Sequence, residues 1–462
     1  MNAKNLQSDA EQLLSLFVES NPNVINLSVA ENILLFDRLQ EIFCPSGPLA
    51  RLKAIFSQNS SCIELSDIKY QSSHGEQALR GAIAQFLNNS FSLNPSLGYE
   101  QVSCLSSTRC ALETAIQALF SDIELSERKV LIPTPYWQGF DWIYEKRWGG
   151  EIIPVPLIPD DNFALTLSKI EEAYNGADSE PKAIVLTNPN NPLGINYDKA
   201  LLEEIFTWIL KNTEMHIFSD EIYAHCQTQS YPSGFVSALA LPLTEVEEEC
   251  RKQRVHVAWG FAKDFGLSGF RVGVVASHNE ELQAGIRSSN RAYFSPMTSS
   301  NNWFISKIFA RPGQAKELMD EMIPLLAERL QEVNNALDSA NIPYFQDTNA
   351  AQFIWLDLRQ WLGQVPPPEK KLKNWYLLDY LKAYLRDKYK EEEELQCFLE
   401  EEKLFEYLEE VAMVSLLPGS TLSNSVPGYF RLCFTAEDRT VVLQAIQQIA
   451  AALEPYRPSA SK

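Results

Sequence analysis

The chain has 462 residues, of which 45% are hydrophobic, with 9 Trp, 17 Tyr and 24 Phe, so its composition is typical of a globular protein and excludes a disordered one. Its 39 basic and 60 acidic side chains give a net charge of −21, which argues against nucleic-acid and membrane-surface partners because it repels phosphate groups. The eight cysteines are scattered without a CxxC pair, so we predict reduced thiols in a cytoplasmic protein, with no disulfide framework and no metal site.

The N-terminal region predicts a helix from Glu11 to Val18, and we expect neither a signal peptide nor a membrane-spanning segment in the chain. An irregular segment follows and ends at Glu31, where the carboxylate can stabilise the start of a helix. Residues 71–87 then predict a loop and a helix with one apolar face. In that loop we expect His74 to make a hydrogen bond rather than to act in catalysis.

From about residue 100 onward, short apolar strands alternate with segments of helical periodicity. This alternation predicts an α/β fold with a largely parallel sheet and helices on both faces. Ligand-binding side chains are then expected at the carboxyl ends of the strands. The predicted strands are residues 102–105, 130–133, 151–155, 182–187, 215–219, 255–259 and 271–277.

Polar and aromatic side chains follow the first two of these strands. Ser107, Thr108 and Arg109 follow the first strand at the start of a helix, where they can either cradle an anion or simply cap the helix. Tyr136 and Trp137 follow the second strand, and this aromatic pair can either cover a flat ring or pack into the core.

Two later strands are also followed by side chains that can bind a ligand. Asn191 lies in the turn-rich segment NPNNPLG, which can aim an amide into the crevice or serve only as a turn. Asp220 and Tyr223 follow the next strand, and an aspartate at the end of an apolar strand is costly to bury unless it is paired.

Lys263 lies between the last two strands, in a segment that we expect to form a tight turn near Arg271. A parallel sheet would present this lysine at its carboxyl edge, although a solvated loop lysine is the alternative. Lysine forms Schiff bases with carbonyl compounds, including pyridoxal phosphate (PLP). The anion cradle, aromatic side chain, amide, carboxylate, phenol, lysine and arginine are together the groups that hold and tune a phosphorylated aromatic aldehyde.

The motifs NPNNPLG, SDEIY and AKDFGLSGFRVG, in this order, resemble those of fold-type I PLP-dependent enzymes of aminotransferase class I/II. The segments LSVAEN, PYWQGFDW, AAQFIWLDLRQWL and VPGYFRLCF are similar to the 1-aminocyclopropane-1-carboxylate (ACC) synthase-like branch. The resemblance implies a mostly parallel seven-stranded sheet with helices on both faces, a smaller α+β domain and a homodimer. It places an N-terminal arm and part of the small domain at 1–59, the large PLP-binding domain at 60–305 and the rest of the small domain at 306–462.

The resemblance also implies roles in cofactor binding for residues at the strand ends. Lys263 would carry PLP in a Schiff base and then move the Cα proton of the substrate. Asp220 would pair with the pyridine nitrogen of the cofactor, and Tyr223 and Asn191 would hydrogen-bond its 3-oxygen. The stacking and phosphate-binding residues would be Trp137, Ser107, Thr108, Arg109 and Arg271.

On the substrate side, Arg431 would clamp the α-carboxylate of the amino acid, for which a bidentate guanidinium is suited, and Glu31 would lie near the substrate. No second arginine can be assigned to a distal carboxylate, so we expect a neutral or thioether-bearing amino acid. Two positions depart from the family pattern. Ser73 stands where a tyrosine usually reaches across the dimer interface, and Gly260 and Ala262 replace two serines before the lysine.

These features predict a PLP-dependent enzyme that acts at Cα of an α-amino acid. Transamination to a 2-oxo acid is the first hypothesis. An ACC synthase-type lyase acting on S-adenosylmethionine or a similar substrate is the alternative, which Glu31 favours and Ser73 opposes. A non-enzymatic PLP-fold binding protein is the third possibility. Residues 364–410 are expected to form an acidic helical insertion with a solvated face, for which a partner surface is the alternative.

Overall fold

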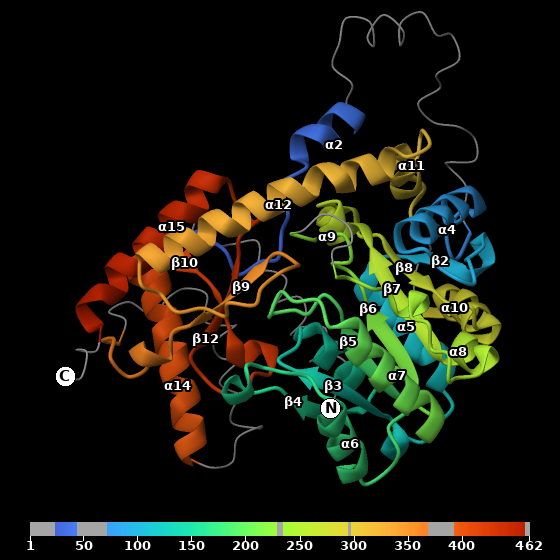
Figure 1. The fold of residues 1–462 in the computed structure, drawn as a ribbon, viewed down its shortest axis with the longest axis horizontal. Helices are drawn as coiled ribbons and strands as arrows, with labels where there is room; N and C mark the ends of the chain where they lie inside the picture. The colour runs from blue at the N-terminus through green and yellow to red at the C-terminus, as the bar shows by residue number, and fades with distance from the viewer. Residues whose placement is uncertain (1–23, 44–71, 229–233, 294–296, 368–391, 458–462) are drawn as a thin grey trace, which may run out of the picture.

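The computed structural model describes residues 24–43, 72–228, 234–293, 297–367 and 392–457 (Figure 1). Its central sheet has seven strands in the order β2-β8-β7-β6-β5-β3-β4. β8 runs antiparallel to its two neighbours, whereas the other pairs are parallel, so the predicted mostly parallel sheet is confirmed. The strands are β2 (Val102–Leu105), β3 (Lys129–Thr134), β4 (Glu151–Pro156), β5 (Ala183–Thr187), β6 (His216–Asp220), β7 (Val255–Gly260) and β8 (Gly273–Ala276).

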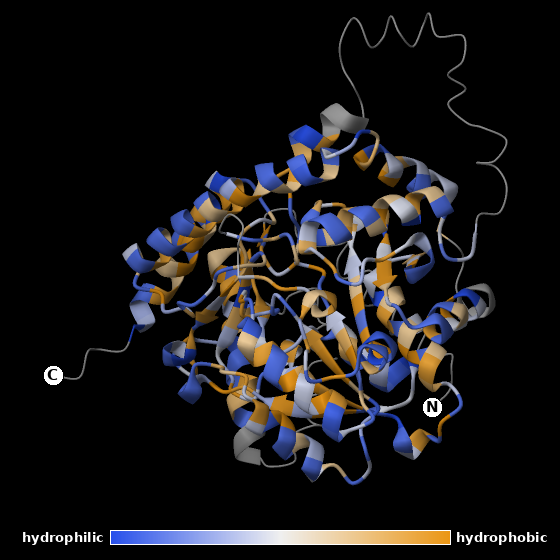
Figure 2. Cartoon of the chain, turned by 45° about the vertical axis from the view of Figure 1, so that its right-hand side comes forward, coloured by the Kyte–Doolittle hydropathy of each residue, from blue (hydrophilic) through white to orange (hydrophobic). Residues whose placement is uncertain are grey.

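Side chains along the central strands alternate between two apolar cores, one on each face of the sheet. In β3, Val130 and Ile132 belong to the core under α5, η3 and α10, whereas Leu131 belongs to the core under α6 and α7. Figure 2 shows the apolar strands enclosed by helices whose polar residues face outward. The helices around the sheet are α4 (Gln77–Phe91), α5 (Thr108–Phe120), the π-helical η3 (Asp141–Arg147), α6 (Leu167–Gly176), α7 (Lys199–Asn212), α8 (Glu248–Arg254) and α10 (Glu280–Tyr293).

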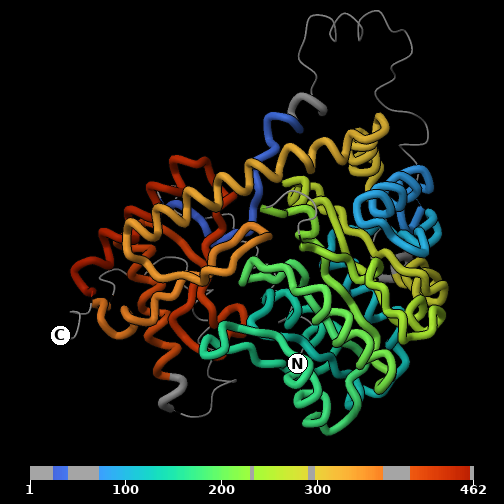
Figure 3. Tube along the Cα trace, in the orientation of Figure 1, coloured from blue at the N-terminus to red at the C-terminus, as the bar shows by residue number. Residues whose placement is uncertain are grey.

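A second, antiparallel sheet has the order β11-β12-β9, formed by Leu417–Pro418, Tyr429–Cys433 and Phe353–Asp357. Beside it, β1 (Ile25–Asn26) pairs in parallel with β10 (Val414–Ser415). The N-terminal segment therefore runs next to the C-terminal strands, as Figure 3 shows. The remaining helices include α2 (Phe36–Phe43), α11 (Ser299–Ile308), α12 (Gln314–Ser339), which contacts both α4 and α15, α14 (Glu392–Tyr407), the π-helical η8 (Leu408–Ala412) and α15 (Arg439–Leu453).

The predicted acidic insertion at 364–410 contains α14, and residues 368–391 within it lie outside the described residues. One face of α14 is not solvated, because Phe398, Glu401 and Leu404 are buried. The predicted helix Glu11–Val18 also lies outside the described residues. In the part of the chain that the structure describes, no helix is both long enough and apolar enough to cross a membrane.

Candidate active site

The segment around Lys263 folds as a short helix, α9 (Phe261–Asp264), between β7 and β8. The predicted tight turn is therefore wrong, because residues 261–264 are helical. Phe261 and Phe265 are both fully buried and their rings stack with centroids 5.3 Å apart, which favours the helical spacing of four residues. The side chain of Asp264 is also buried and accepts a hydrogen bond from the Trp259 indole at 2.8 Å, so α9 is fixed to β7.

Two separate parts of the chain hold Lys263. Its main-chain carbonyl accepts hydrogen bonds from the Asn32 amide at 3.1 Å and from the Gln352 amide at 3.0 Å. Its ammonium group donates to the Ala30 carbonyl. Burial lowers the pKa of Lys263, and the negative charge of Glu31 opposes that shift. A lysine with a lowered pKa is suited to exchange a proton near neutral pH.

Asp220 ends β6 and is almost completely buried. Among the described residues, its carboxyl group accepts one long hydrogen bond, from the Ile222 N–H at 3.4 Å. Burial raises the pKa of Asp220 to about 7. A buried carboxylate that accepts so little hydrogen bonding from the protein is a good partner for a cationic ligand atom.

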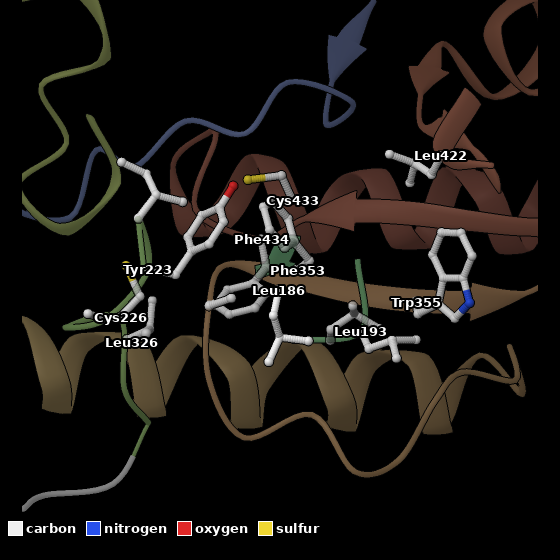
Figure 4. Close-up of a cluster of buried hydrophobic side chains, with 14 of the residues drawn as sticks. Leu186, Leu193, Tyr223, Cys226, Leu326, Phe353, Trp355, Leu422, Cys433 and Phe434 are labelled. Atoms are coloured by element: carbon white, nitrogen blue, oxygen red, sulfur yellow. The ribbon is translucent and has the colours of Figure 1, made fainter. Parts of the chain in front are cut away.

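Tyr223 is buried near Arg431 and Cys433. Its ring packs edge-on against Phe353 with centroids 5.2 Å apart, and its hydroxyl is directed toward the Cys433 sulfur (Figure 4). Burial raises the pKa of Tyr223 well above its ordinary value, while the nearby charge of Arg431 opposes that shift. The phenol therefore stays protonated and can donate a hydrogen bond.

Arg431 extends from β12 and is buried. It donates to the Asn191 amide oxygen at 2.8 Å and to the Ser28 carbonyl at 2.7 Å, and its guanidinium lies 4.3 Å from the centre of the Phe353 ring. Its Nε atom is buried with no hydrogen-bond partner among the described residues. The structure thus joins two predicted site residues that are 240 positions apart, and it leaves a donor on Arg431 for a ligand.

The predicted anion cradle lies at the start of α5. Ser107 caps this helix, since its hydroxyl accepts from the Cys110 N–H at 3.3 Å, and Thr108 donates to the Trp259 carbonyl at 3.4 Å. A Cβ on Gly273 would lie 2.2 Å from the Thr108 nitrogen, so β8 can approach the helix only because this residue is glycine. A Cβ on Gly260 would lie 2.5 Å from the Thr108 hydroxyl, so a serine there would displace it.

Three further predicted cofactor residues lie around this cradle. The Arg109 guanidinium lies 5.4 Å from the centre of the Trp142 ring, which in turn packs edge-on against Trp137 with centroids 6.5 Å apart. Arg271 is exposed and donates to the Ser268 carbonyl at 2.9 Å. Burial lowers the pKa of Arg109, the charge of Glu113 opposes that shift, and the positive charges of Arg147 and, to a smaller extent, Arg271 add to it. An anion bound near Arg109 and Arg271 would relieve the repulsion between them.

Sequence reasoning missed several residues that complete the site. Asn32 and Gln352 hold the Lys263 carbonyl, and the Cys433 thiol donates to the Glu31 carbonyl at 3.4 Å. The only signal was their presence within segments already singled out by resemblance, LSVAEN, AAQFIW and FRLCF. His74 makes the expected loop hydrogen bond, at 3.1 Å to the Ser72 hydroxyl. Ser73 is buried in the same loop.

The residues present fit PLP. The poorly compensated Asp220 suits a protonated ring nitrogen, and the positive charges of Arg109 and Arg271 near the start of α5 suit a phosphate. The Nε atom of Arg431, buried and without a partner among the described residues, suits a carboxylate.

Comparisons with known proteins identify the family of this chain. The family model "Aminotransferase class I and II" matches residues 64–449. The 1-aminocyclopropane-1-carboxylate synthase of Nicotiana tabacum is 28% identical over 435 residues, covering 93% of this chain and 79% of the relative. The synthase CMA101 of Cucurbita maxima is also 28% identical over 435 residues, covering 93% of this chain and 82% of the relative.

Among solved structures, the aspartate aminotransferase of Rhizobium meliloti superposes with a TM-score of 0.69 at 19% identity, covering 98% of this chain and 96% of the other. The aromatic aminotransferase of Pyrococcus horikoshii gives a TM-score of 0.68 at 18% identity, covering 97% and 99%. These likenesses show the fold, which is PLP fold type I. The chain belongs to the class I and II aminotransferase family, whose members depend on PLP, and PLP is its cofactor.

Proposed function

We propose that the protein is an aminotransferase that moves the amino group of an α-amino acid to a 2-oxo acid. The arrangement of Lys263 carries this proposal. Burial lowers the pKa of its amino group, on which the charges of Glu31, Arg431 and Arg271 also act. A lysine in this setting can accept a proton from a substrate carbon and return it to another position.

PLP, when bound, supplies an electron sink that stabilises negative charge at the substrate Cα. The Asp220 carboxylate would hold the ring nitrogen, and Tyr223 and Asn191 would hydrogen-bond the 3-oxygen. Ser107, Thr108, Arg109 and Arg271 would hold the phosphate, and Trp137 would cover the ring. Arg431 would fix the substrate carboxylate, so that the Cα–H bond is held toward the Lys263 amine.

The substrate is proposed to be a neutral or thioether-bearing amino acid. Arg431 can serve the α-carboxylate, and no second arginine could be assigned from the sequence to a distal one. Competition assays with single amino acids test this point. A strong preference for aspartate or glutamate over neutral amino acids would contradict it.

A lyase of the ACC synthase type is the second candidate, because the curated relatives described above carry that name. Glu31 also favours it, because Glu31 matches a carboxylate that lies near the substrate in the ACC synthase-like branch. Ser73 counts against it, because the family usually has a tyrosine at this position. In this reaction the cofactor would return unchanged, whereas transamination leaves it as pyridoxamine phosphate.

The absorption spectrum of the purified holoprotein distinguishes the two reactions during titration with single amino acids and with S-adenosylmethionine, without any 2-oxo acid. Lasting conversion to the pyridoxamine form supports the aminotransferase and identifies its donor. A transient change that returns to the starting spectrum while the substrate disappears supports the lyase. Absence of a cofactor band, even after PLP is added, contradicts both.

We also propose that the chain forms a homodimer, as the resemblance implies. Light scattering of the purified protein tests this, and a monomer at the concentrations used for the spectra would contradict it.

A further inference from the structure

Glu401 lies on α14, in the segment predicted to be an acidic insertion, yet it is completely buried. Its Oε1 atom accepts hydrogen bonds from the Ser420 N–H at 2.9 Å and from the Ser420 hydroxyl. Its Oε2 atom accepts from the Gly428 N–H at 2.5 Å. One carboxyl group therefore ties together the two ends of residues 419–428, which we name the 419–428 loop.

This loop reaches both halves of the site. The Leu422 carbonyl accepts a hydrogen bond from the Tyr136 N–H at 2.8 Å, and Tyr136 directly precedes Trp137. At its other end, Gly428 leads directly into β12, which carries Arg431. Movement of the loop would therefore shift the aromatic segment and the strand of the carboxylate-binding arginine together.

We propose that Glu401 is a positioning residue, whose carboxylate fixes the 419–428 loop and so fixes the positions of Trp137 and Arg431 relative to each other. This inference rests on the proposed function, which gives those two residues their roles. The three groups that face the carboxyl group are all donors, and an ionised carboxylate can accept from all of them. A protonated acid keeps all three contacts only if its hydrogen lies on Oε1 and is donated to the Ser420 hydroxyl, and the bonds from the two N–H groups then lose the strength that the negative charge gives them.

The charge on Glu401 is therefore expected to control the loop. Burial raises the pKa of Glu401 to about 7, and the hydrogen bonds from Ser420 and Gly428 oppose that shift. The 419–428 loop itself contains no charged residue. Arg359 packs against Gly428, but its guanidinium is paired with Asp357 at 2.7 Å. Among residues 396–412 on α14 and η8, the other charged groups are Glu400, Glu402, Lys403, Glu406, Glu409 and Glu410, and Asp357 and Arg359 lie beside Gly428.

Hydrogen exchange of the full-length apoprotein at pH 6 and pH 8, corrected for intrinsic rates, tests the control of the loop. In the wild-type protein, we expect amides of the 419–428 loop to exchange about tenfold faster at pH 6, because the bonds from the two N–H groups are weaker to a neutral acid than to a carboxylate. Glu401→Gln places an amide NH2 among the donors, so it should exchange rapidly at both pH values. Glu402→Gln, a buried neighbour on the same helix, should behave as the wild type does.

Titration with PLP then connects the loop with the site. Glu401→Gln is expected to weaken PLP binding about tenfold, with a smaller effect for Ser420→Ala, which removes one of the three donors. If Glu401→Gln fails to fold, Ser420→Ala still tests the inference. Unchanged loop exchange in these variants, or wild-type PLP affinity with only a lowered melting temperature, would overturn it. Failure of the wild-type protein to bind PLP would instead contradict the proposed function, because loop exchange is measured without cofactor.

Discussion

Replacing Asp220 by Asn should change how the stability of the apoprotein depends on pH. Burial raises the pKa of this carboxyl group from its ordinary value of 3.8 to about 7. In the unfolded chain this carboxyl group ionises at a lower pH than it does in the folded protein. The free energy of unfolding therefore falls as the pH rises from about 3.8 through about 7, and the loss is constant above that range. The full deficit is about 4 kcal/mol, and about 3 kcal/mol of it develops between pH 5 and pH 8.5.

The assay is urea unfolding of both apoproteins at pH 5 and pH 8.5, from which the free energy of unfolding is extrapolated to water. Asn is neutral at both pH values, so any cost of burying its amide cancels when the two pH values are compared. We expect the free energy of unfolding of Asp220→Asn, relative to that of the wild type, to be about 3 kcal/mol higher at pH 8.5 than at pH 5. The exposed control Asp347→Asn should show no such gain. An unchanged difference between wild type and Asp220→Asn at the two pH values would refute the reasoning.

Three further predictions concern single side chains. Tyr144→Phe should stabilise the apoprotein by about 1 kcal/mol in urea unfolding, because the Tyr144 hydroxyl is fully buried without a hydrogen-bond partner among the described residues; a destabilised variant would contradict this. Burial lowers the pKa of His216 to about 4. The free energy of unfolding should therefore fall by about 3 kcal/mol as the pH falls from about 6.5 to about 4, and His216→Asn should remove that part of the pH dependence. Lys263→Ala should abolish borohydride-reducible attachment of PLP, measured by mass spectrometry, and a surviving lysine adduct would show that another residue carries the cofactor.

The sequence was most informative where local patterning and tertiary packing agree. Strands such as β7 are buried on both faces, so their apolar, β-branched composition marks them without knowledge of their neighbours. The helix α9 could not be predicted in this way, because its four residues are too few to show helical periodicity. It forms through burial of Phe261 and Phe265 against the core, which is a tertiary effect.

The candidate site shows the same division. Motifs identified Lys263, Asn191 and Arg431 as separate residues, but the bond between Asn191 and Arg431 spans 240 positions and follows only from the fold. The surroundings that set the pKa of Lys263 likewise come from distant segments. Burial of Glu401 was unpredictable for a related reason, since its neighbours in sequence are charged and its three hydrogen-bond donors lie in a distant loop.

The N-terminal segment is a structural part of the site. Ala30 accepts a hydrogen bond from the Lys263 amine, Asn32 holds the Lys263 carbonyl, and Ser28 accepts from Arg431. These contacts require that the segment be docked, and it is anchored by pairing of β1 with β10 and by a hydrogen bond of 2.9 Å from the Cys433 N–H to the Leu27 carbonyl. The same β12 strand carries Arg431 and begins directly after the 419–428 loop. The segment, the loop and the lysine helix are therefore linked through β12, so a change at any of them is expected to reach Lys263 and Arg431 together.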